Sequence, residues 1–275
     1  MIRLRQLDPR YFASFLITLI LVLGEARYGI LGGYDRLVIA LGVCVATELV
    51  LSRLLRGAFA NVSSAYITGI SLALLIKPRT ALLWPFALGG FIAIASKYVL
   101  QIRGRHLWNP SNFAVSLLVV AAPASVAILS HQWGNDLAVN AVIWGFGLAI
   151  VSRVGMLHVT LTYVVSFIAF AALRHGLAGG PLMAELAPLT GPMYQLFIFF
   201  MVTDPKTTVS TVRGRMVVVA AVAAVEAAIR AAGDHHVSLL SALYPAPPIL
   251  ALAMVGPLAK VVEVYRAAPS ARSPE

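Results

Sequence analysis

The chain has 275 residues, of which 60% are hydrophobic and only 12% are charged. Soluble domains are close to half apolar and about a quarter charged, so this composition excludes an ordinary soluble domain. The formal net charge is +10, but the basic residues occupy short stretches between apolar segments and do not form one soluble face. We therefore expect an integral membrane protein surrounded by lipids, with no nucleic acid partner.

Ten hydrophobic segments follow one another along the chain, each bounded by charged residues or by proline and glycine. A helix needs about 20 apolar residues to cross a hydrocarbon core of about 30 Å. We therefore expect an all-α polytopic bundle of about ten transmembrane helices, in which 1–275 form a single integral membrane domain and 11–262 its transmembrane part. The segments lie at 11–28, 35–52, 64–76, 82–100, 112–129, 137–152, 157–173, 188–203, 216–232 and 238–261.

The basic residues predict the orientation of the bundle. Of the 21 Lys and Arg residues, 15 fall on the side of the N-terminus if the ten segments alternate, which leaves six on the other side. The positive-inside rule then places both termini in the cytoplasm, with residues 1–10 before the bundle and a polar tail over 263–275 after it. Residues 1–10 run into the first segment without a small-residue cleavage pattern, so we expect an uncleaved first helix.

A weak internal similarity predicts a repeat. The dipeptide Thr-Gly opens the third segment at 68–69 and the eighth at 190–191, and these segments end in Lys-Pro-Arg-Thr at 77–80 and Asp-Pro-Lys-Thr at 204–207. An offset of five segments reverses the orientation, which indicates an inverted five-plus-five repeat with broken helices around a site at the membrane midplane. Alternatively, such matches arise by chance in membrane helices, where glycine mainly permits close packing.

The first polar cluster covers 103–113. Pro110 fits the first turn of a helix with Asn109 as its N-cap, and the free amides there form an anion or polar-ligand site beside Arg103 and Arg105. The alternative is a well-capped cytoplasmic helix start whose arginines only set the topology.

The second polar cluster follows the eighth segment. Thr203 and Asp204 precede Pro205, which ends the helix. The Asp204 carboxylate could accept hydrogen bonds from a flavin or quinone ring, or could cap the loop and pair with Lys206 or Arg213. Thr68 and Thr190, each followed by a glycine, are further ligand candidates.

Two carboxylates within hydrophobic segments have ordinary explanations. Glu226 precedes Arg230 by four residues, which predicts an ion pair on one helix. Glu48 lies about a turn from the end of the second segment, and we expect it to extend toward Arg53.

Signatures of metal or hydrolytic chemistry are missing from the sequence. Cys44 is the single cysteine, which excludes an internal disulfide and a thiolate-bound iron–sulfur or zinc site. There is no His-Glu-x-x-His run, phosphate-binding Gly-rich loop or Gly-x-Ser-x-Gly turn. We therefore expect no metal held by this chain.

The two polar clusters resemble a known family. The runs Phe-Met-Val-Thr-Asp-Pro at 200–205 and Asn-Pro-Ser-Asn at 109–112, with Ala-Ser-Lys at 95–97 and Gly104, are similar to the D subunit of the Rnf electron-transport complex and the B subunit of the sodium-pumping NADH:quinone reductase. The resemblance extends over about 65–232. It is closest to a divergent branch that includes members found with enediyne biosynthesis genes.

The resemblance implies a ten-helix, inverted-repeat subunit of the bacterial cytoplasmic (inner) membrane. Such a subunit holds flavin and passes electrons toward quinone or a partner subunit within a redox complex. Flavin-bearing members attach FMN to the threonine of a Ser-Gly-Ala-Thr run after the fifth span, but the corresponding loop at 129–136 has no threonine. We therefore expect no covalent FMN, which leaves non-covalent FMN or riboflavin, or no flavin.

The leading hypothesis is a membrane electron-transfer subunit. In it, Asn109, Asn112 and Asp204 line a polar pocket near the cytoplasm, together with Thr203, and Arg105 attracts an anionic ligand or partner. The main alternative is a small-molecule or ion transporter or channel that uses the broken third and eighth segments on the same scaffold. A scaffold subunit that only positions its partners is a third reading.

Overall fold

The computed structural model describes residues 9–78, 81–123, 125–126 and 137–266, and these are helical almost throughout. The first part comprises α1 (Pro9–Tyr28), α2 (Tyr34–Arg56), α3 (Ser63–Leu75), α4 (Trp84–Val99), an antiparallel hairpin of β1 (Gln101–Ile102) and β2 (Arg105–His106), α5 (Pro110–Ala121) and α6 (Leu137–Arg153). The second part comprises α7 (Leu157–Ala178), α8 (Leu182–Leu186), a 3-10 turn (Ala187–Thr190), α9 (Pro192–Leu196), the π-helical turn η3 (Phe197–Met201), α10 (Val212–Asp234), a 3-10 turn (Ser238–Leu243) and α11 (Pro247–Arg266).

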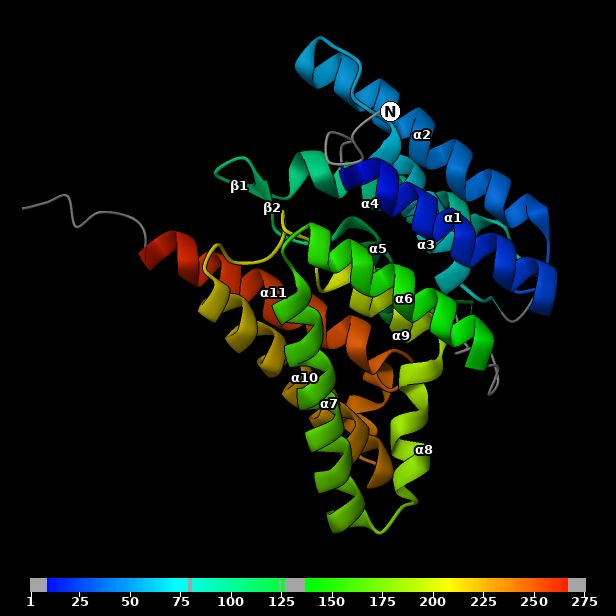
Figure 1. The fold of residues 1–275 in the computed structure, drawn as a ribbon. Coiled ribbons are helices and arrows are strands. Elements are labelled where there is room, and N and C mark those ends of the chain that lie inside the picture. Colours follow the sequence, from blue (N-terminus) through cyan, green and yellow to red (C-terminus); the bar gives the residue numbers. More distant parts are fainter. Residues whose placement is uncertain (1–8, 79–80, 124, 127–136, 267–275) are drawn as a thin grey trace, which may run out of the picture.

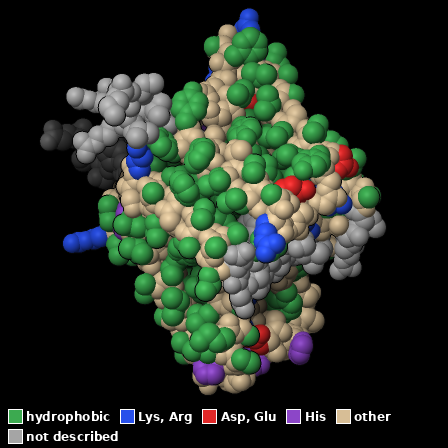
Figure 2. Space-filling view, turned by 45° about the vertical axis from the view of Figure 1, so that its right-hand side comes forward, with side chains coloured by type: hydrophobic (Ala, Val, Ile, Leu, Met, Phe, Trp, Pro, Cys, Tyr) green, Lys and Arg blue, Asp and Glu red, His purple; other side chains and the backbone are tan. Residues whose placement is uncertain are grey.

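The chain is an all-α membrane protein. Within the described residues, five helices are long and apolar enough to cross a membrane, namely α1, α2, α7, α10 and α11. The helices α3, α5 and α6 are apolar but shorter. Figure 2 shows hydrophobic side chains spread over most of one face, with few charged groups among them. Many large hydrophobic side chains are exposed, and a surface of this kind is suited to lipid.

Two predicted segments are interrupted. The third is the 13-residue helix α3, which gives way to extended backbone at Ile76. The eighth was predicted as one segment over 188–203, but it consists of a 3-10 turn, the short helix α9 and the π-helical turn η3. Interruptions at both places agree with the broken helices expected there.

The end of the last helix differs from the predicted one, and several predicted features lie outside the described residues. The helix α11 continues to Arg266, into the stretch predicted as a polar tail. Residues 1–8, the Arg-Thr end of the repeat motif at 79–80, the whole loop predicted at 129–136 and the rest of the tail lie outside the described residues.

Helix packing divides the molecule into two groups with a shared centre. Figure 1 shows α1, α2 and α4 above, and α7, α8 and α10 below. In the upper group α2 packs against α3 and α4, whereas in the lower group α10 packs against α7 and α11. The groups meet where α1 contacts α6, where α5 contacts α11 and where α3 contacts α9.

Glycine permits the closest approach in the upper group. A Cβ atom at Gly69 would lie 2.9 Å from the Cα atom of Leu41, so α3 and α2 are in backbone contact at this point. Close packing therefore explains the glycine of the Thr-Gly pair in the third segment.

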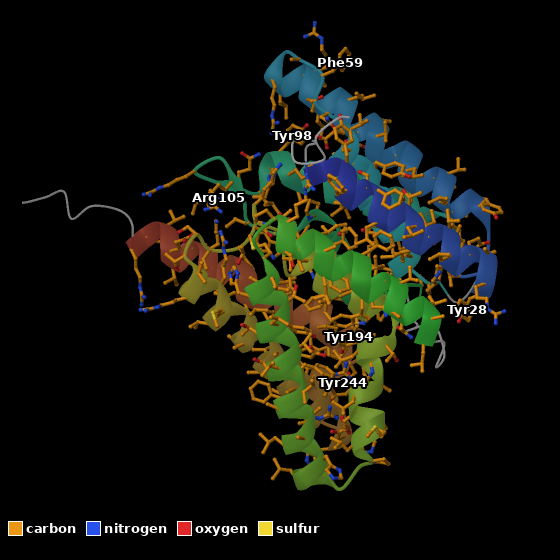
Figure 3. All side chains as sticks on the ribbon, viewed as in Figure 1. Tyr28, Phe59, Tyr98, Arg105, Tyr194 and Tyr244 are labelled. Carbon is orange, nitrogen blue, oxygen red and sulfur yellow. The ribbon has the colours of Figure 1, made fainter. Side chains whose placement is uncertain are left out.

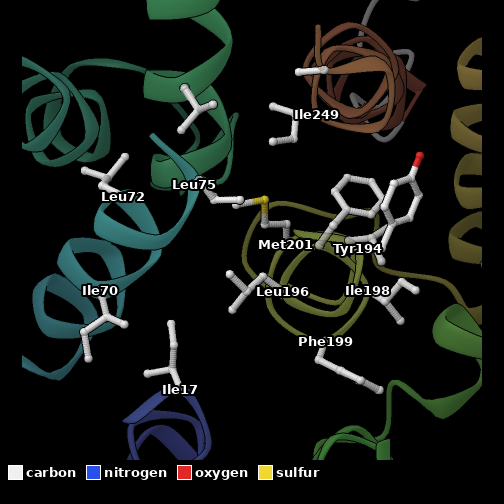
Figure 4. Close-up of a cluster of buried hydrophobic side chains, with 14 of the residues drawn as sticks. Ile17, Ile70, Leu72, Leu75, Tyr194, Leu196, Ile198, Phe199, Met201 and Ile249 are labelled. Atoms are coloured by element: carbon white, nitrogen blue, oxygen red, sulfur yellow. The ribbon is translucent and has the colours of Figure 1, made fainter. Parts of the chain in front are cut away.

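A hydrophobic core fills the centre where the two groups meet. Figure 4 shows side chains of α3 facing those of α9 and η3, with α1 and α11 at the border. Leu72, Leu196 and Met201 are almost completely buried there. This core holds the two interrupted segments against each other and so supports the cavity described next.

Candidate functional site

A cavity of about 310 Å³ lies between the two helix groups. Its volume is in the range of small-molecule sites. Helices α1, α3 and α4 contribute from the first part of the chain, and η3 with the loop after it contributes from the second. The lining residues are Ala13, Ser64, Ile67, Thr68, Ser71, Lys97, His106, Asn109, Pro110, Ser111, Ile150, Val154, Phe199, Phe200, Thr203, Asp204, Pro205 and Lys206.

Asn109 and Asp204 form a polar wall of the cavity. Asn109 is the N-cap of α5, as predicted: its Oδ1 accepts the Asn112 amide at 3.1 Å and the Ser111 hydroxyl at 2.9 Å. Its Nδ2 donates to Asp204 Oδ2 at 3.1 Å. The other carboxylate oxygen of Asp204 accepts the main-chain N–H of Lys206 at 3.0 Å. The cap thus fixes the amide, and the amide orients the carboxylate.

Another part of the cavity lining is apolar and partly aromatic. Phe199 and Phe200 belong to η3, and Ile150 and Val154 lie at the end of α6. The Phe199 ring packs edge-on against Trp144 with 5.1 Å between ring centroids. Both phenylalanines of this π-helical turn line the cavity.

The helix α3 adds hydroxyl groups. Thr68 Oγ1 donates to Ser64 O and Ser71 Oγ donates to Ile67 O, each at 2.8 Å. Each hydroxyl donates its hydrogen within the helix, so what it offers the cavity is an acceptor oxygen.

Lys97 is a cation of the cavity wall that the sequence analysis did not select. It lies on α4, and its ammonium group forms a buried ion pair with Glu48 of α2. The prediction that Glu48 extends toward Arg53 is therefore wrong, because Arg53 donates to Gly57 O instead. A carboxylate buried in this interface is stabilised by the nearer buried cation, and not by an exposed one at the helix end.

His106 was also missed, although it lies within the 103–113 cluster. Burial lowers the pKa of His106, and the positive charge of Lys206 lowers it further. Its Nδ1 is buried and has no hydrogen-bond partner. His106 therefore borders the cavity with its Nδ1 unpaired.

The remaining predicted residues have different positions. Thr203 lines the cavity, and its hydroxyl donates to Phe199 O at 2.8 Å. Asn112 lies behind the cavity wall, where its Nδ2 donates to Ile249 O at 2.9 Å. Thr190 is exposed and bonds to Ala187 O, away from the cavity.

Arg105 holds the loop that carries Asp204. Its guanidinium group donates to the main-chain oxygens of Pro205 and Thr208, each at 3.2 Å. Lys260 of α11 donates to the same Thr208 oxygen at 2.7 Å. Arg105 therefore positions the loop, and it is not among the residues that line the cavity.

A second buried ionisable cluster lies between α7 and α10. The predicted pair of Glu226 and Arg230 is confirmed, with 3.0 Å between Glu226 Oε1 and Arg230 Nε. Tyr163 and Tyr194 also donate to the carboxylate, and Arg230 donates to Tyr194. Figure 3 shows Tyr194 in the lower helices, apart from Arg105 near the hairpin.

Within the described ranges, no three His, Cys, Asp or Glu side chains are grouped so that they could hold a metal ion. No protein-family model matches the sequence, and no curated protein matches it either.

Proposed function

We propose that this chain is a membrane-embedded electron-transfer subunit that binds a flavin non-covalently in the cavity between the helix groups. The observation that carries the proposal is that one cavity is lined both by the aromatic side chains Phe199 and Phe200 and by the fixed polar pair of Asn109 and Asp204. This combination of aromatic and polar lining, together with the resemblance of the two polar clusters to electron-transport subunits, favours a planar redox ligand over other ligand classes.

The residues present fit a flavin. Its ring system has apolar faces and one polar edge that carries both an N–H group and carbonyl oxygens, so it requires an apolar wall, an acceptor and donors. Phe199 supplies the wall, Asp204 the acceptor, and Lys97 a cation. A bound flavin would supply exchange between two-electron and one-electron carriers, which is the chemistry that an electron-transfer subunit needs. FMN and riboflavin share this ring, and a quinone has a similar planar shape.

The proposed architecture is ten spans in two inverted halves of five. The packing supports it, because α2 packs on α4 as α7 packs on α10, and α4 packs on α5 as α10 packs on α11. The contacts of α1 with α6, α5 with α11 and α3 with α9 each join elements that correspond under such a repeat.

The proposed location is the bacterial inner membrane, with both termini in the cytoplasm. In Figure 1 the hairpin and the C-terminal ends of α2 and α11 lie toward the same side of the molecule. The hairpin carries Arg103, and the two helices end at Arg56 and Arg266. The partners would be other membrane subunits of a redox complex, and the electron acceptor a quinone or one of these subunits.

An absorbance spectrum of the purified protein tests the proposal. We expect a flavin spectrum after purification or after addition of riboflavin or FMN. Asp204→Ala should weaken riboflavin binding by about tenfold, because one good hydrogen bond to a charged group is lost. The matched control is Asp234→Ala, which removes a carboxylate bound to Arg174 outside the cavity. If neither flavin binds the unaltered protein, the proposal fails.

A transporter is the second candidate, favoured by the two interrupted segments. The helix α3 and the α9–η3 segment end in extended or turn backbone and are in contact with each other. Such breaks often surround a transport path at the midplane. Uptake of a solute or ion into liposomes by a protein that binds no chromophore would favour this reading and contradict electron transfer.

A further inference from the structure

Lys97 borders the cavity, whereas its counter-ion lies behind it. The Lys97 side chain is only 7% exposed and lines the cavity, but Glu48 is not among the lining residues. Of the two members of the ion pair, the lysine is therefore the one that lines the ligand space.

Glu48 divides its negative charge between two donors. Besides Lys97, it accepts the Tyr98 hydroxyl at 3.0 Å, and the guanidinium group of Arg56 lies over the Tyr98 ring at 4.7 Å from its centroid. Asp204, another carboxylate of the cavity lining, is bound by the Asn109 amide and the main chain of Lys206. Glu48 is thus the counter-ion of Lys97, whereas Asp204 is bound by neutral donors.

We propose that Lys97 determines which redox form the cavity prefers, by binding the reduced, anionic form of a flavin more tightly than the oxidised, neutral form. The inference rests on the proposed function, since it requires a flavin in the cavity. Glu48 and Tyr98 act as positioning residues, because they hold the ammonium group at the wall.

The charge balance of the reaction gives the reason. An oxidised flavin that takes up two electrons and one proton carries one net negative charge on its ring at neutral pH. A buried ammonium group stabilises that charge more than an exposed one does, because the effective dielectric constant is low there. Lys97 forms no bond and transfers no proton: the electrons come from the reductant and the proton comes from the solvent.

The experiment measures dissociation constants for riboflavin in its oxidised form and in its dithionite-reduced form, using anaerobic detergent-solubilised protein. The unaltered protein should prefer the reduced form. Lys97→Met should lower that preference about tenfold, which for a two-electron couple corresponds to about 30 mV in the midpoint potential. Lys97→Arg keeps the charge and should retain the preference.

A second variant guards against misfolding. Lys97→Met alone leaves Glu48 buried without its cation, so Lys97→Met combined with Glu48→Gln removes both charges and should fold. It should show the same loss of preference. Lys206→Met, which removes an exposed cation at the cavity rim, should change the preference by less than about twofold because water screens its charge.

The outcomes separate the two proposals. If the unaltered protein binds riboflavin in neither form, the proposed function fails and the role of Lys97 fails with it. If riboflavin binds but the ratio of the two dissociation constants is unchanged in both Lys97→Met variants, only the role of Lys97 is overturned. Equal weakening of both forms would show a structural role and would also overturn it.

Discussion

Glu48 and Glu226 are buried carboxylates that lie in different surroundings. Glu48 on α2 pairs with Lys97 on α4 beside the cavity, whereas Glu226 on α10 lies against α7, where two tyrosines and Arg230 saturate its oxygens. A buried ion in a membrane helix is often a sign of function. The comparison teaches that a neighbouring cavity matters as much as the charge: Glu226 is held by three donors within a helix interface, whereas Lys97, the partner of Glu48, lines a cavity of about 310 Å³.

The largest effect that would test this contrast is on stability. Glu226→Leu removes the carboxylate that partly buried Arg230 and two buried tyrosines share, so we expect a loss of roughly 3–5 kcal/mol in the free energy of unfolding. Thermal unfolding in detergent measures it. Glu226→Gln, which can still accept from Tyr163, should lose less.

Riboflavin affinity provides the complementary measurement on the same Glu226 variants. Protein that remains folded should bind riboflavin as the unaltered chain does, because the cluster lies outside the cavity lining. A change in affinity with unchanged stability would show that the Glu226 cluster is part of the binding site. The distinction between this cluster and the Glu48–Lys97 pair would then be lost.

A matched pair of glycines on α6 tests how firmly the aromatic wall is held. A Cβ atom at Gly147 would lie 2.5 Å from the ring of Phe199, whereas one at Gly145 would have no neighbour within 4 Å. Gly147→Ala should therefore displace Phe199, destabilise the fold by about 1–3 kcal/mol and weaken riboflavin binding. Gly145→Ala should do neither. Equal melting temperatures for the two variants would contradict the tight contact.

Asn109 joins helix capping to the cavity, so its replacement should affect both stability and binding. Asn109→Ala removes the N-cap of α5, which should cost about 0.5–2 kcal/mol, and it also releases Asp204. Asn109→Ser keeps a capping oxygen but has no amide for Asp204. Its stability should be near that of the unaltered protein, with the riboflavin affinity still reduced. If Asn109→Ser bound riboflavin normally, orientation of Asp204 by the amide would be refuted.

The smallest expected effect is a pH dependence at the cavity rim. Because the pKa of His106 is lowered in the folded state, the unfolded chain binds more protons just below the ordinary pKa of about 6.5. Stability should therefore be complete above that pH and decrease as the pH falls through this range. Melting temperatures between pH 7.5 and 5 should decrease more for the unaltered protein than for His106→Gln, and parallel curves would exclude the effect.

Two of the cavity-lining residues could be predicted from the local sequence. Asn109 and Asp204 stand beside prolines that begin or end helices, and such polar residues at helix breaks in an apolar chain are strong signals. Lys97 and His106 were not selected from the sequence. Both lie near basic residues at helix ends, which membrane topology already explains. Thr190 was selected from its similarity to Thr68, but the irregular 3-10 and α9 segment leaves it exposed and away from the cavity.

What the sequence by itself determined is the membrane class, the helical fold and the places where helices are interrupted, because hydrophobicity, proline and glycine act locally along the chain. Only the tertiary structure decided the partners of the buried charges. Glu48 is five residues from Arg53 but pairs with Lys97 on another helix. In an apolar interior the nearest buried cation stabilises a carboxylate, and which cation is nearest depends on how α2 packs against α4.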